Sequence, residues 1–119
     1  MTFKVLLANQ KSLQVPRNER KRRMDFIGYF EFDPKDFDDI IPLFRKAMAV
    51  REKEPDKFPK IVYGPVSMAG GWKGFSIYED PTAEQMNAIV IHYMPYMTFK
   101  FVNISPAPKM IEQYLKEKK

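Results

Sequence analysis

The spacing of apolar side chains divides the chain after Met24 into strand-like and helix-like segments. Asp25–Phe32 is rich in aromatic and branched residues, which is typical of a β-strand. Asp33-Pro34 then supplies a helix cap followed by proline. Pro42 is expected to kink or split the helix that follows. Its buried face is predicted from apolar residues at helical spacing: Phe37, Ile40, Ile41, Phe44 and Met48.

A hairpin is predicted next. Ile61–Val66 favours a second strand, in which Pro65 indicates a position at the edge of a sheet. The turn residues Ala69-Gly70-Gly71 separate it from a third strand, Trp72–Tyr78. Two strands joined by so short a turn are expected to pair antiparallel.

The rest of the chain repeats the helix-then-strand pattern. Asp80-Pro81 resembles the first helix start and predicts an N-cap, while Pro95 ends the helix. The apolar stripe of this second helix consists of Met86, Ile89, Val90 and Tyr93. Thr98–Ile104 predicts a fourth strand. A short terminal helix follows, with an apolar side formed by Met110, Ile111, Tyr114 and Leu115.

The resulting order, β-α-β-β-α-β, predicts an α+β fold of the ferredoxin-like type with an antiparallel sheet. Residues 1–23 form an N-terminal extension outside this pattern, and residues 24–119 form the domain with its terminal helix. A chain of 119 residues is long enough for one such core and too short for two.

Both faces of the predicted sheet carry large apolar side chains. In the first strand Phe26 and Phe30 share one face, while Ile27 and Tyr29 share the other. Two helices cover only one face of a four-stranded sheet, so the second face needs another partner. We expect a homodimer that packs the two open sheet faces together. The alternative is that residues 1–23 or the terminal helix fold back over this face.

The hairpin and the fourth strand also carry a family resemblance. The stretches Gly70–Asp80 and Tyr96–Ile104 resemble the DUF3303 family of uncharacterised proteins, within the dimeric α+β barrel superfamily. That superfamily places a small ligand between the helices and the concave sheet, and it includes cofactor-free monooxygenases, haem-degrading monooxygenases and isomerases. The haem-degrading members use an asparagine, which the first strand here lacks, so no cofactor is expected.

Composition excludes several kinds of chemistry. The chain has no cysteine and a single histidine, so thiolate catalysis and Cys-ligated metal sites are excluded, and no metal is expected. No apolar run approaches the roughly 18 residues that span a bilayer, and no signal peptide opens the chain. A cytoplasmic protein without membrane contact is therefore expected.

Candidate ligand contacts are aromatic residues with polar tips and the one histidine. A cleft between helices and sheet is expected to use His92, Trp72, Tyr63, Tyr78 and Tyr96 to bind a small apolar or aromatic ligand. A cofactor-free oxygenase or isomerase, with His92 or a tyrosine as proton carrier, is the alternative. The same aromatic residues also suit a core or an interface, so whether the protein is an enzyme stays open.

The positive charge is confined to the N-terminal extension. Residues 1–23 contain seven Lys or Arg and one Glu, which gives a net charge of +6. Residues 24–119 contain thirteen Lys or Arg and fourteen Asp or Glu, which gives a net charge of −1. We call its last part the basic arm: Arg17, Arg20, Lys21, Arg22 and Arg23. Such an arm is able to contact nucleic-acid phosphates. The arm lacks interleaved aromatic residues for base stacking, so nucleic acid is the less favoured partner. The alternative is that the arm is a solvated linker or a partner in ion pairs.

Overall fold

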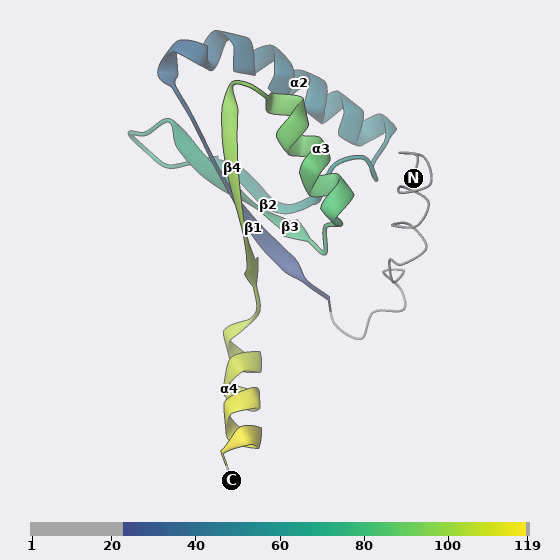
Figure 1. Ribbon diagram of the computed structural model, residues 1–119, viewed down its shortest axis with the longest axis vertical. Coiled ribbons are helices and arrows are strands. Elements are labelled where there is room, and N and C mark those ends of the chain that lie inside the picture. The colour runs from purple at the N-terminus through teal and green to yellow at the C-terminus, as the bar shows by residue number, and fades with distance from the viewer. Residues whose placement is uncertain (1–22, 119) are drawn as a thin grey trace, which may run out of the picture.

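The computed structural model describes residues 23–118, which form a four-stranded antiparallel sheet with two helices on one face (Figure 1). The element order is the predicted β-α-β-β-α-β, and the strand order β2-β3-β1-β4 is that of a ferredoxin-like fold. The bounds are β1 Asp25–Phe32, η2 Pro34–Asp36, α2 Phe37–Lys53, β2 Lys60–Ser67, β3 Lys73–Glu79, α3 Ala83–Tyr93, β4 Met97–Ile104 and α4 Ala107–Glu117. The predicted fold class is thus confirmed.

The pairing of β1 with its two neighbours fixes which side chains share a face. Gly28 lies opposite Ser76 of β3 and Phe101 of β4 on the face below the helices. Ile27 lies opposite Ile77 and Val102 on the other face, which we call the open face. The predicted division of apolar residues between the two faces is therefore correct, because side chains alternate along each strand.

The core lies between the helices and the sheet. Its fully buried members come from α2, α3 and the connection before β2: Ile40, Ala47, Phe58, Ile89 and Tyr93. Aromatic residues of β1 and β4, such as Phe32 and Phe99, pack against this cluster from the sheet. Burial of each large side chain contributes roughly 1.5–3 kcal/mol, so this cluster accounts for much of the stability of the domain.

The two helix starts differ, although both carry an Asp-Pro pair. Asp33 accepts a hydrogen bond from the backbone N–H of Lys35 and caps η2 as predicted, and α2 continues unbroken through Pro42. Asp80 does not cap α3, which corrects the prediction: its φ is +42°, and it accepts a bond from the backbone N–H of Met24. Thr82 caps α3 instead, in a reciprocal capping box with Gln85.

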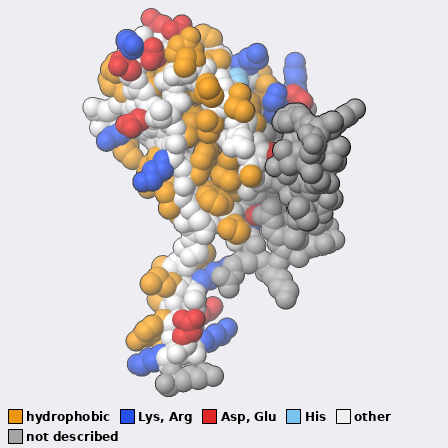
Figure 2. Space-filling view, viewed as in Figure 1, with side chains coloured by type: hydrophobic (Ala, Val, Ile, Leu, Met, Phe, Trp, Pro, Cys, Tyr) orange, Lys and Arg blue, Asp and Glu red, His pale blue; other side chains and the backbone are white. Residues whose placement is uncertain are grey.

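Helix α4 stands away from the rest of the domain (Figure 1). Its apolar residues are exposed, and they appear as hydrophobic side chains on the projecting helix in Figure 2. They are 59–74% exposed: Met110, Ile111, Tyr114 and Leu115. The terminal helix therefore does not fold back over the open face of its own sheet. Residues 1–22, the other expected cover, lie outside the described residues.

Candidate functional site

An apolar cleft of about 310 Å³ lies between α2 and the sheet. The α2 side of this cleft is a stripe that we call the cleft stripe: Phe37, Ile41, Phe44 and Met48. The sheet side is formed mainly by Phe30, Phe32, Ile61, Tyr78 and Phe99. The volume is within the range of small-molecule sites, roughly 300–1,000 Å³.

The cleft stripe corrects the predicted core. Phe37, Phe44 and Met48 were expected to be buried, yet they are 40–42% exposed. Helix α2 does bury Ile40, as predicted, and Ala47 is buried with it on the side that packs toward α3. The half-exposed side of α2 faces the cleft, whose opposite wall includes Ile61 of the edge strand β2.

One end of the cleft stripe is polar. Arg51 follows Met48 on α2 and lines the cleft with Tyr78 and Tyr93. Its guanidinium donates a hydrogen bond to the Pro59 carbonyl, and it lies over the ring of Phe58 at 5.6 Å. Burial lowers the pKa of Arg51, an effect that the two tyrosines oppose.

Both tyrosines beside Arg51 are held in the neutral form. Burial raises the pKa of Tyr78, and a hydrogen bond with Ser76 and the charge of Arg51 partly oppose this. Burial raises the pKa of Tyr93 to about 12, again against the charge of Arg51. Both hydroxyls are protonated at neutral pH, as in any ordinary tyrosine, and the raised pKa makes the tyrosinate form still less accessible, so neither is suited to proton abstraction.

The raised pKa of Tyr93 predicts a loss of stability in alkali. The unfolded chain loses this proton near pH 10, whereas the folded chain keeps it to about pH 12. The unfolding free energy should therefore fall by roughly 2–3 kcal/mol between these pH values. Urea denaturation across this range should show the decline, and Tyr93→Phe should remove most of it. If the unfolding free energy of Tyr93→Phe falls as much as that of the wild type, the loss of stability comes from the ionisation of other groups.

The structure separates the five predicted ligand residues. Tyr78 lines the cleft. Trp72 lies at its edge, with its ring 6.0 Å from Phe32 and 5.4 Å from Phe37, two residues that line the cleft. Tyr96 packs against the core cluster and is not among the residues that line the cleft.

His92 and Tyr63 lie outside the cleft. His92 bonds through Nε2 to the carbonyl oxygen of Leu43 at 2.7 Å, which joins α3 to α2. Tyr63 lies on the open face, where its ring is 6.1 Å from that of Phe75. The register of β2 shifts after Ile61, so Tyr63 pairs with Ile77 rather than with a residue below the helices.

Sequence reasoning missed Arg51. A signal was present, because Arg51 continues the cleft stripe at intervals of four, three, four and three residues from Phe37. Because the sequence pattern predicts this stripe to be buried core, it gives no reason to single out the cation at its end.

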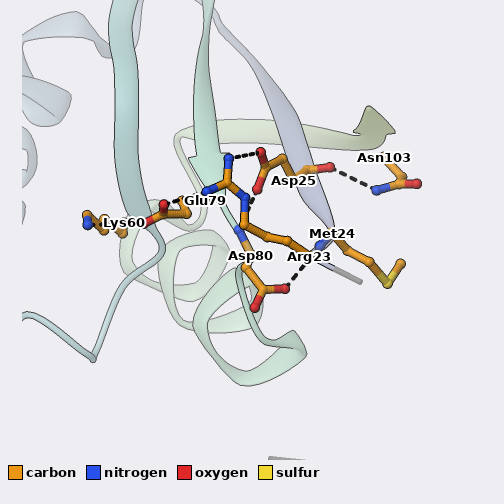
Figure 3. A network of polar contacts seen from close by, with 7 residues as sticks. All are labelled: Arg23, Met24, Asp25, Lys60, Glu79, Asp80 and Asn103. Carbon is orange, nitrogen blue, oxygen red and sulfur yellow. Dashed lines mark hydrogen bonds and ion pairs between the residues drawn. The ribbon is translucent and has the colours of Figure 1, made fainter. Parts of the chain in front are cut away.

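Only Arg23 of the basic arm is described, and it is engaged by the domain itself (Figure 3). It pairs with Asp25 and Glu79 at 2.8 Å each, and the hydrogen bond with Asp25 is the main cause that raises its pKa. Asp25 also accepts a bond from the backbone N–H of Asp80. This network joins the start of β1 to the end of β3. The other members, Arg17, Arg20, Lys21 and Arg22, lie outside the described residues.

Comparison with known proteins does not identify a family for this chain. No protein-family model, no curated protein and no solved structure matches the chain. What is shown is an α+β fold with a four-stranded antiparallel sheet, and the resemblance to DUF3303 stays a prediction.

Two further features bear on partners. Within residues 23–118, no helix is long and apolar enough to cross a membrane, and no three potential metal-ligating side chains gather at one place. The helices expose apolar residues such as Phe44, Met110 and Tyr114, which indicates an interaction surface. The structure identifies no partner for it.

Proposed function

We propose that this protein binds a small, largely apolar ligand in the cleft between α2 and the sheet. The observation that carries the proposal is the cleft stripe, a row of large apolar side chains that remains half-exposed along a cavity of about 310 Å³. Large apolar side chains left beside an open cavity lose the free energy of burial, and a ligand that fills the cavity restores it.

Phe44→Asp tests the ligand proposal. Phe44 is 42% exposed, so the domain should tolerate the change, but a carboxylate would face the apolar ligand. Binding of decan-1-ol, measured by calorimetry on the full chain, should weaken at least roughly tenfold, because burying an unpaired charge is costly. Ala49→Asp is the matched control: it adds the same charge to the exposed side of α2 and should bind as the wild type does. Equal affinity in the wild type and Phe44→Asp would overturn the proposal.

We also propose that two copies associate through their open faces. Tyr29 and Val102 are each 39% exposed on this face, and Tyr63 is 55% exposed beside them. Tyr63, Ile77, Ile27 and Val102 form one apolar row across the sheet from β2 to β4, and Lys100 lies beside Tyr29 on the same face. A two-fold interface between such surfaces would bury them while leaving the cleft on the opposite side accessible.

A further inference from the structure

We propose that the cleft ligand carries one carboxylate, which pairs with Arg51 while the apolar body of the ligand lies along the cleft stripe. This inference rests on the proposed function, because it specifies the ligand of the same cleft. It assigns the ligand to the class of amphipathic acids with a negative charge at one end.

The first support is the state of Arg51. Its side chain is partly buried, and among residues 23–118 no carboxylate lies within ion-pair distance of it. Glu54 and Asp56 are near in the sequence but form no ion pair with this guanidinium. Removing an unpaired charge from water costs free energy, and an anion bound beside it offsets that cost.

The second support is the hydrogen-bonding capacity that Arg51 retains. A guanidinium has five N–H donors, and in residues 23–118 Arg51 uses one of them in a hydrogen bond to the Pro59 carbonyl oxygen. Arginine binds carboxylates through two parallel hydrogen bonds when two adjacent donors are available.

The third support is the linear arrangement of apolar and charged positions. From Phe37 to Arg51 the cleft residues of α2 lie on one side of the helix, over about 21 Å at a rise of 1.5 Å per residue. The apolar residues occupy all of this length except the last position, where the cation lies. A ligand that matches the row therefore has an apolar body and a charge at one end only.

The test compares two ligands that differ only at the head: decanoate and decan-1-ol. Calorimetry on the full chain at neutral pH should show that decanoate binds roughly tenfold to a hundredfold more tightly, as expected for a hydrogen-bonded charge pair. The chain has a single tryptophan, Trp72, at the edge of the cleft, so a change in its emission would locate both ligands there.

Arg51→Gln should abolish the preference for decanoate, so that decanoate and decan-1-ol bind this variant with similar affinity. Arg51→Lys keeps the charge without the paired donors and should retain part of the preference, which guards against a fold defect in the glutamine variant. Arg45→Gln is the matched control, because Arg45 is an exposed arginine of the same helix outside the cleft, and it should keep the full preference.

The outcomes separate the inference from the proposed function. Equal affinity of the wild type for both ligands, or a preference for decanoate that persists in Arg51→Gln, would refute the pairing of a ligand carboxylate with Arg51. Neither result would contradict the binding of an apolar ligand in the cleft. Failure of both ligands to bind the wild type would overturn the proposed function, and this inference with it.

Discussion

Replacing Ile27 with lysine is expected to abolish self-association of this protein. Ile27 lies at the centre of the open face, between Ile77 of β3 and Val102 of β4. In a two-fold dimer each protomer would bring one lysine, so two unpaired ammonium groups would enter the interface. Each uncompensated buried charge costs about 3–5 kcal/mol, so the dimer should weaken by at least roughly a thousandfold.

Light scattering on a sizing column measures the absolute mass in solution and so distinguishes the dimer from the monomer. The wild-type full chain should elute as a dimer and Ile27→Lys as a folded monomer, because the lysine remains in water when the face is free. Asn87→Lys adds the same charge to an exposed position of α3 and should remain dimeric. A wild-type monomer would refute the dimer, and a dimeric Ile27→Lys would move the interface to another surface, with α4 the next to test.

Gly74→Ala is expected to destabilise the fold more than any other small substitution in the sheet. Gly74 lies opposite Phe30 in β1 and Ser67 in β2. A Cβ at this position would overlap the carbonyl oxygen of Val66 and lie 2.6 Å from Cζ of Phe30. The phenyl ring has some freedom to move, but the carbonyl is held by the pairing of β2 with β3.

Urea denaturation should show a loss of about 3 kcal/mol for Gly74→Ala, the upper end of the cost of overpacking a core. Gly71→Ala is the control: its Cβ would meet no atom closer than 3.6 Å, so its stability should remain near that of the wild type. A small effect of Gly74→Ala would mean that the edge strand β2 shifts readily, and with it the sheet side of the cleft.

The sequence predicted the fold because the relevant signals are local. Asp25–Phe32 has the composition of a strand, and Asp33-Pro34 starts a helix through a bond between neighbouring residues. The short turn between β2 and β3 permits only antiparallel pairing. Strict alternation along β1 also placed Ile27 and Phe30 on opposite faces before any tertiary contact was known.

The candidate site was less predictable, because it depends on contacts between distant segments. Tyr63 and Tyr78 were expected to share the cleft, yet the shifted register of β2 places Tyr63 on the other face. His92 was a candidate for its chemistry, and its contact with the Leu43 carbonyl gives it a role between two helices. Nothing within either local segment specifies these partners.

Local patterns along the chain are enough to predict the order of elements, the faces of the regular strands and the presence of more apolar residues than one core needs. They are enough because periodicity and capping act over a few neighbouring residues. The position of α2 on the sheet, in contrast, is visible only in the folded protein. That placement buries Ile40 and Ala47, leaves Phe44 beside the cleft and puts Arg51 at the end of the cleft. It could not be predicted locally, because the position of a helix on a sheet depends on packing between segments far apart in the chain.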